Sequence, residues 1–152
     1  MNTLLDIQSF LALHRIAVVG VSRNPKDFTR VLFRDLLQRG YDAVPVNPAV
    51  EDVEGLRCYA RVADIPAPVD GALLVTKPEV TDQVVRECAE AGIRSIWMHR
   101  GGGHGAVSKG ASSFCAVVGI KVVEGECPYM FLPQAQWIHR AHGFCRKLLM
   151  RL

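Results

Sequence analysis

Short apolar runs alternate along the chain with amphipathic stretches of helical periodicity. The predicted strands are the β-rich runs at 16–20, 43–46, 72–75, 93–98 and 117–123. The apolar positions between them recur at helical spacing up to Gly40 and again up to Gly92, so each glycine marks a predicted helix end. The segment 103–116 is small and polar, and is weakly helical at best. Buried strands separated by helices predict an α/β fold: an open parallel sheet of about five strands with helices on both faces.

Both ends of the chain carry further helical patterns. Residues 3–13 predict an N-terminal helix, and residues 134–151 predict a C-terminal one, each apolar enough to pack on the sheet. No internal repeat or linker divides the sequence. A length of 152 residues suits one domain, since single domains run to about 100–200 residues, so the prediction is one domain over 1–152.

Composition and charge exclude several classes of protein. Hydrophobic residues make up 49% and charged residues 22% of the chain, as in ordinary globular proteins. A net charge of +3 with 7% aromatic residues does not favour nucleic-acid binding. No apolar run long enough for a membrane span and no signal peptide is visible. Five widely spaced cysteines do not suggest a disulfide framework. We therefore expect a cytoplasmic protein with reduced thiols, and neither nucleic acid nor membrane as a partner.

The first predicted strand runs into a turn with anion-binding features. Ligands of open parallel sheets bind beyond the carboxyl ends of the strands, where the strand order reverses. Backbone amides at the start of the following helix attract anions, Ser22 adds a hydroxyl, and Arg23 and Lys26 add positive charge. A lone glycine turn is weak evidence, however, and a purely structural turn explains the spacing equally well.

The turn lacks the dinucleotide fingerprint G-x-G-x-x-G. Ser22 replaces the second glycine and Pro25 replaces the third. The second predicted strand ends in Val46-Asn47-Pro48, without the acidic residue that would hold a ribose. Ordinary NAD binding is therefore disfavoured.

Several segments resemble a known family. They read IAVVGVSRNP at 16–25, GYDAVPVNP at 40–48, GLRCY at 55–59, KPE at 77–79 and GIRSIW at 92–97. Over roughly residues 10–128 the chain is similar to the bacterial and archaeal CoA-binding domain proteins. These proteins are small stand-alone relatives of the N-terminal domain of the succinyl-CoA synthetase alpha subunit. The P-V-N-P stretch is the most specific part of the resemblance.

The resemblance implies a Rossmann-like domain that binds coenzyme A (CoA) across the strand ends; the family has no agreed catalytic activity. The diphosphate would be held by the turn formed by Gly20, Val21, Ser22, Arg23, Asn24 and Pro25. The nucleotide cleft would be lined by Val46, Asn47 and Pro48. The loop after the third strand would be Thr76, Lys77 and Pro78, with Lys77 reaching a phosphate. Positive charge around the phosphates would come from Arg23, Lys26, Arg30 and Lys77.

Two segments depart from the family pattern. Where the family commonly reads Trp-x-Gln and then glycine, this chain reads Trp97-Met98-His99-Arg100 followed by a glycine-rich loop. That change falls at the pantetheine end of the implied site, so His99 joins the candidate cofactor-binding residues. Cys127 matches the family's cysteine near the last strand, but 128–131 replaces the acidic residue that often follows it.

Three catalytic or metal-binding hypotheses compete with plainer structural roles. His99 and His104, expected in the glycine-rich loop, have the chemistry of an acid–base pair, but no carboxylate lies nearby in sequence. The set Cys127, His139, His142 and Cys145 suggests a metal site but lacks a close Cys-x-x-Cys pair. Cys127 alone is a candidate for a mixed disulfide with CoA. In each case packing or loop hydrogen bonding is the favoured interpretation, so no catalytic or metal residue is assigned.

The favoured function is binding of CoA or an acyl-CoA without catalytic machinery of the chain's own. A protein partner would then supply the chemistry, or the chain would form a homo-oligomer. Two alternatives remain open: an NAD(P)- or nucleotide-dependent enzyme that uses His99 or Cys127, and a regulatory interaction domain without a ligand.

Overall fold

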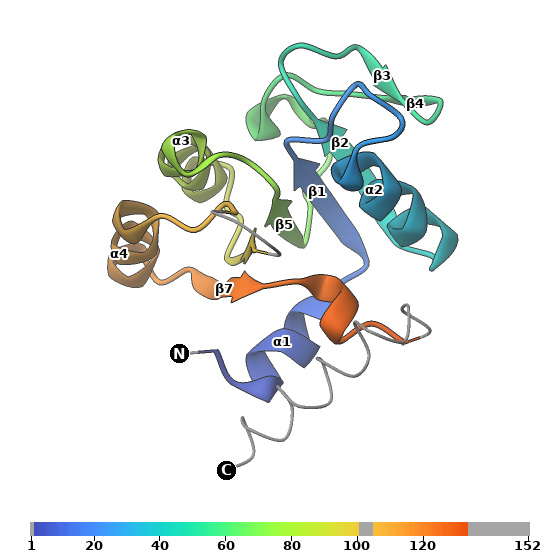
Figure 1. Ribbon diagram of the computed structural model, residues 1–152. Helices are drawn as coiled ribbons and strands as arrows, with labels where there is room; N and C mark the ends of the chain where they lie inside the picture. Colours follow the sequence, from blue (N-terminus) through green and yellow to red (C-terminus); the bar gives the residue numbers. More distant parts are fainter. Residues whose placement is uncertain (1, 101–104, 134–152) are drawn as a thin grey trace.

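The computed structural model describes residues 2–100 and 105–133 (Figure 1). The helices are α1 (Leu4–Leu11), α2 (Phe28–Gln38), α3 (Pro78–Glu90) and α4 (Lys109–Val118), with 3-10 turns η1 (Val62–Asp64) and η2 (Pro128–Met130). The strands are β1 (Arg15–Val19), β2 (Asp42–Val46), β3 (Asp52–Val53), β4 (Leu56–Arg57), β5 (Gly71–Leu74), β6 (Ser95–His99) and β7 (Lys121–Glu126). Within these ranges no helix combines the length and apolar character needed to cross a bilayer. The helix predicted at 134–151 lies outside the described residues.

The main sheet is parallel and has five strands in the order β2-β1-β5-β6-β7. The chain passes from β1 to β2 on one side and then returns to β5 on the other side of β1. The strand order therefore reverses between β1 and β5. The predicted Rossmann-like α/β fold is confirmed.

Helices cover both faces of the sheet, as the sequence predicts (Figure 1). Along β1, Ile16 and Val18 face the layer that contains α1 and α2, whereas Ala17 and Val19 face the layer that contains α3 and α4. Because successive strand side chains point to opposite faces, a strand buried on both sides reads as a continuous apolar run. This explains why the strands were recognisable from hydropathy alone.

The prediction for the segment before the last strand is wrong. Residues 109–118 form α4, which begins after Ser108, whose hydroxyl accepts a hydrogen bond from the Ala111 amide at 3.4 Å. The helix ends at Gly119, whose φ of +78° is the left-handed conformation typical of helix ends. Val117 belongs to the last helical turn and is 86% exposed. Its β-branched side chain therefore misled the strand prediction, and β7 begins only at Lys121.

A small hairpin that the sequence did not reveal stands beside the carboxyl end of β2 (Figure 1). β3 and β4 pair antiparallel, with Val53 opposite Leu56. The two residues between them, Glu54 and Gly55, both have positive φ, of 52° and 76°. This is the backbone of a tight two-residue hairpin turn.

Candidate functional site

The turn after β1 lies where the ends of β1, β2 and β5 meet. The Gly20 amide donates to the Val46 carbonyl at 2.8 Å, and the Val75 amide donates to the Val19 carbonyl at 2.9 Å. Gly20 has a φ of +100°, and a Cβ atom there would lie 2.9 Å from the Val75 carbonyl oxygen. Both the conformation and the close approach require glycine. The turn therefore lies at the reversal of strand order, the usual ligand position of such sheets.

Some hydrogen-bond donors of the turn already have an acceptor within the described residues, and others do not. The Ser22 amide donates to Thr29 Oγ1 at 2.9 Å, and the Ser22 hydroxyl donates to the Asp27 carboxylate at 2.5 Å. The hydroxyl expected to meet a phosphate is thus already bonded to a carboxylate. Across the part of the chain that the structure describes, the Val21 and Arg23 amides donate to no other group. Val21 is fully buried, however, so the amide of the exposed residue Arg23 is the donor available to an anion.

The basic residues around the turn divide into two kinds. The side chains of Arg23, Lys26 and Lys77 are exposed and can reach a ligand. Arg30, by contrast, is only 9% exposed. Its guanidinium contacts the Glu54 carboxylate at 2.9 Å and donates to the Ser22 and Arg23 carbonyls at 3.2 and 3.1 Å. Its charge is therefore neutralised locally, which differs from the expected role of attracting phosphate.

Asn47, at the end of β2, supports the turn rather than pointing to solvent. Its side-chain amide donates to the Val21 carbonyl at 2.8 Å, while its side-chain oxygen accepts from the Ala49 amide at 2.9 Å. Its backbone amide donates to the Tyr59 carbonyl at 2.9 Å. Asn47, which directly follows β2, thus connects the turn to the segment after the hairpin.

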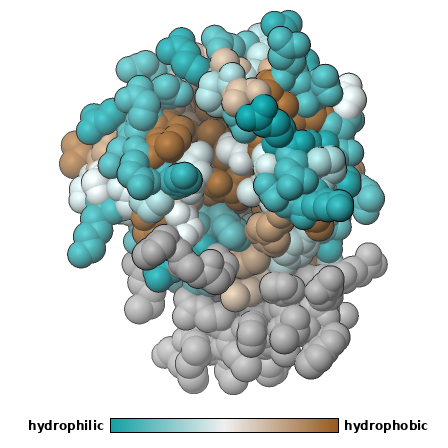
Figure 2. Space-filling view, turned by 45° about the horizontal axis from the view of Figure 1, so that its top comes forward, coloured by the Kyte–Doolittle hydropathy of each residue, from teal (hydrophilic) through white to brown (hydrophobic). Residues whose placement is uncertain are grey.

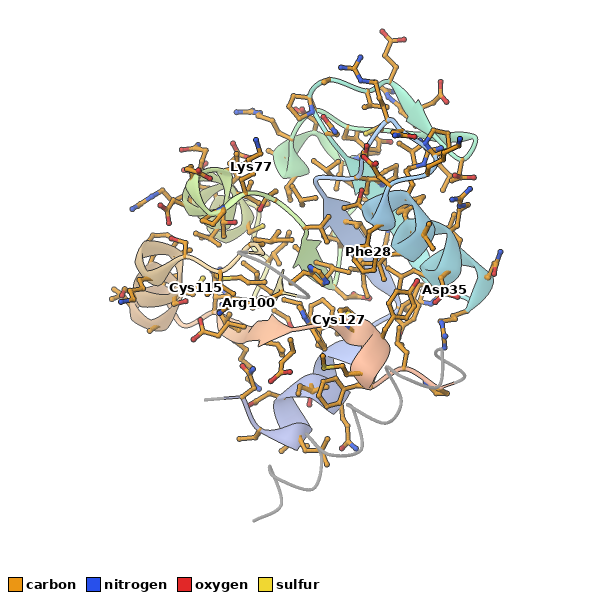
Figure 3. The ribbon with its side chains drawn as sticks, in the orientation of Figure 1. Phe28, Asp35, Lys77, Arg100, Cys115 and Cys127 are labelled. Atoms are coloured by element: carbon orange, nitrogen blue, oxygen red, sulfur yellow. The ribbon has the colours of Figure 1, made fainter. Side chains whose placement is uncertain are left out.

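A pocket of about 570 Å³ opens on the other side of the turn, above β5 and β6. Its lining residues are Thr29, Val75, Thr76, Lys77, Pro78, Glu79, His99, Gly105 and Ala106. The structure thus brings Thr76, Lys77 and Pro78 to the same pocket as His99. Figure 2, which views this end of the molecule, shows apolar atoms in a depression surrounded by hydrophilic residues. Phe28, on α2, and Lys77, at the start of α3, lie on opposite sides of β5 (Figure 3).

A second pocket, of about 670 Å³, lies beyond the end of β2. It is lined by Pro48, Val50, Glu51, Arg57, Cys58, Tyr59, Ala60 and Asp64. The Arg57 guanidinium lies 5.2 Å from the centre of the Tyr59 ring. Of these lining residues the sequence analysis names only Pro48 as part of the nucleotide cleft. It does not name Arg57 or Tyr59, because they reach the pocket through the hairpin, which the sequence did not reveal. The sequence analysis also did not name Thr29, which lines the pocket beside His99. Its position one helical turn after the glycine turn could have indicated that it lies near the site.

His99 is the last residue of β6 rather than part of the loop, which corrects the sequence interpretation. Its ring lies 5.2 Å from the Phe28 ring. Its Nε2 atom is buried and has no hydrogen-bond partner among residues 2–100 and 105–133. Burial lowers the pKa of His99 to about 4, so the imidazole is neutral at physiological pH. A neutral imidazole with an unused ring nitrogen is suited to hydrogen bonding with an uncharged ligand group.

The lowered pKa of His99 predicts a specific loss of stability in mild acid. Its ordinary pKa is 6.5. Between that value and about 4 the unfolded chain takes up a proton that the folded chain does not. The free energy of unfolding should therefore fall as the pH is lowered through this window. His99→Phe should reduce this fall, measured by urea unfolding at pH 7 and pH 5. The same pH dependence in both proteins would contradict the assignment.

The described cysteines are packing residues. Cys58, Cys88, Cys115 and Cys127 are all buried. Cys127 is 2% exposed, and burial raises the pKa of its thiol. A mixed disulfide with CoA needs an accessible thiolate, so this geometry does not favour that hypothesis. His104, His139, His142 and Cys145 lie outside the described residues.

Trp97 is also a packing residue. Its side chain is fully buried, and its ring meets those of Phe10 and Phe131 edge to face, with centres 5.4 and 6.4 Å away. The indole N–H donates to the Glu126 carbonyl at 2.8 Å. No part of the ring is left for cofactor stacking.

Comparison with known proteins identifies the family of this chain. The family model described as CoA binding domain matches residues 14–133. The alpha subunit of ADP-forming acetate–CoA ligase II from Pyrococcus furiosus is 35% identical over 82 residues, which are 53% of this chain but only 18% of that subunit.

Two solved structures resemble the chain over almost their whole length. A conserved hypothetical protein from Pyrococcus furiosus is 36% identical with a TM-score of 0.69, covering 75% of this chain and 95% of that one. A hypothetical protein from Pyrococcus horikoshii is 29% identical with a TM-score of 0.76, covering 84% and 92%. The chain therefore belongs to the CoA-binding domain family.

Proposed function

We propose that this chain binds CoA or an acyl-CoA across the carboxyl ends of its parallel strands, with the diphosphate at the turn from Gly20 to Pro25. The observation that carries the proposal is that this turn lies between two pockets at the reversal of strand order. A ligand with a nucleotide at one end and a long tail at the other suits that arrangement. Membership of the CoA-binding domain family gives independent support.

The phosphates are held by a backbone amide and mobile positive charges. The amide of Arg23, an exposed residue whose N–H has no acceptor among the described residues, is the available donor within the turn. The exposed side chains of Arg23, Lys26 and Lys77 add positive charge that can adjust to the ligand. Because these contacts are partly electrostatic, CoA affinity should fall as salt is added.

The two ends of the ligand occupy the two pockets. The nucleotide lies beside Pro48, near the ring of Tyr59 and the guanidinium of Arg57. The pantetheine arm crosses the turn and reaches the pocket beside His99, where the uncharged imidazole meets its terminal group. This places His99 in a binding rather than a catalytic role.

The proposed function is binding, without a catalytic step carried out by this chain. Within the described residues, His99 Nε2 lacks a partner that would orient it for proton transfer, and Cys127 is buried. The chain spans less than a fifth of the ligase subunit that it resembles. We therefore propose that any reaction of the bound acyl-CoA depends on a partner protein or on another copy of this chain.

A thermal-shift comparison of CoA, acetyl-CoA, NAD, NADP and ATP tests the proposal. A ligand at about 100 times its dissociation constant stabilises a one-site protein by about 2.7 kcal/mol. We expect CoA and acetyl-CoA to raise the melting temperature and the other three to raise it much less. A response to NADP alone would favour the oxidoreductase alternative. No response to any of the five would favour an interaction domain without a ligand.

A further inference from the structure

The hairpin between β3 and β4 carries a glutamate where that residue type is costly. Glu54 has a φ of +52° and precedes Gly55, which also has a positive φ. Turns of this kind favour Asn-Gly or Asp-Gly, because side chains other than those of Asn and Asp tolerate the left-handed region poorly. The turn conformation therefore does not explain a glutamate at this position.

The Glu54 side chain instead reaches across to α2. Its Oε1 atom accepts hydrogen bonds from Arg30 Nη2 at 2.9 Å and from Arg30 Nε at 3.2 Å. Arg34 Nε lies 3.7 Å from the same oxygen. The side chains of Arg30 and Glu54 are only 11% and 24% exposed. A largely buried, two-point contact of this kind fixes the direction of a guanidinium group.

The remaining contacts of Arg30 run to the phosphate turn. Its Nη1 atom donates to the carbonyls of Ser22 and Arg23 at 3.2 and 3.1 Å. The carbonyl and the N–H of a planar trans peptide point in opposite directions. Carbonyls held toward Arg30 therefore turn the amides of Arg23 and Asn24 away from it. The Asn24 amide bonds to Ser22 Oγ, which leaves the Arg23 amide for a ligand.

We propose that Arg30 and Glu54 are positioning residues for the phosphate turn, and that neither contacts the ligand. Arg30 fixes the orientation of the Arg23 amide, and Glu54 holds Arg30 in place from the hairpin. The same hairpin carries Arg57, so this contact also ties the nucleotide pocket to the turn. The inference rests on the proposed function, since it concerns the same site.

Replacing Glu54 distinguishes positioning from simple charge attraction, because the two predict opposite signs. If the positive charge of Arg30 attracted phosphates directly, removing the Glu54 carboxylate would strengthen CoA binding. If Arg30 acts by orienting the turn, the same change weakens binding. Glu54→Gln removes only the charge. Glu54→Asn also removes the contact with Arg30 but gives the hairpin its preferred turn residue, so hairpin unfolding cannot account for its effect.

We expect Glu54→Asn to bind CoA about tenfold more weakly in titration calorimetry, and Glu54→Gln, whose side-chain oxygen can still accept from Arg30, to bind it about threefold more weakly. Amide hydrogen exchange at Asn24, whose amide donates to Ser22 Oγ at 3.0 Å, should also be faster in the ligand-free variants. Asp42→Asn is the control, because it removes a negative charge from a half-exposed carboxylate at the other end of β2, where its partner is Arg15; it should change neither measurement. Unchanged or tighter binding, or unchanged exchange at the turn, would overturn the inference. Failure of the wild-type protein to bind CoA would refute the proposed function, and the exchange rates would still decide this inference.

Discussion

Replacing Ser22 with aspartate is expected to weaken CoA binding by about 100-fold, or about 2.8 kcal/mol at about 1.4 kcal/mol per factor of ten. Ser22 lies in the middle of the turn, and its hydroxyl already contacts the Asp27 carboxylate. A carboxylate at position 22 would place two negative charges beside the expected position of the diphosphate. The dissociation constant is to be measured by titration calorimetry at fixed salt, since the repulsion is screened by ions.

Ser22→Asn is the matched control for that substitution. Asparagine has the size of aspartate without its charge, and it can still donate a hydrogen bond to Asp27. We expect the asparagine variant to retain most of the CoA affinity. If the aspartate variant bound CoA as tightly as the wild-type protein, the diphosphate would not lie at this turn. Equal losses in the two variants would assign the effect to the shape of the side chain instead of its charge.

Gly20→Ala is expected to lower the stability of the fold by about 3 kcal/mol. Position 20 has a φ of +100°, which L-residues rarely adopt, and the new methyl group would lie 2.9 Å from the Val75 carbonyl oxygen. The backbone cannot easily shift to relieve the contact, because Gly20 and Val75 directly follow β1 and β5, which are interior strands of the sheet. For a chain of this size the melting temperature should fall by about 6–12 °C.

Gly40→Ala separates the two causes of that loss. Gly40 has a similar φ of +93°, but a Cβ atom there would meet nothing within 4 Å. We expect it to cost about 1 kcal/mol, the penalty of the backbone conformation alone. A Gly20→Ala protein no less stable than the Gly40→Ala protein would show that β1 and β5 do not approach as closely as described.

The sheet was predictable because its strands are buried on both faces. A run such as Ile16–Val19 is apolar throughout, since alternate side chains enter different helix layers. Element boundaries were less predictable where propensity and context disagree. Val117 and Val118 favour a strand by type, yet the Ser108 cap and the left-handed Gly119 place them in the last turn of α4. A single capping serine and a single glycine are local signals that the hydropathy pattern of the chain does not show.

The position of the candidate site in the fold could be predicted from the sequence, but most contacts between its residues could not. The alternation of strands and helices, the glycine after the first strand and the family resemblance were enough to predict a candidate ligand turn at Gly20. The sequence could not show that Arg30 is neutralised by Glu54, because that pairing needs the hairpin to dock on α2. The end of β6 could not be fixed either, so His99 was expected in a loop. In both cases the missing information is a contact between segments distant in sequence.

The central claim is that the diphosphate of CoA binds at the turn after β1. The most direct measurement is a titration of isotopically labelled protein with CoA, followed by the backbone amide resonances in two-dimensional NMR spectra. We predict saturable shifts of the Arg23 and Asn24 amides, with little change at Ala91, which lies beside Val69 and Ile93 near the amino ends of β5 and β6. Saturable shifts centred at Ala91, with Arg23 and Asn24 unmoved, would contradict the account.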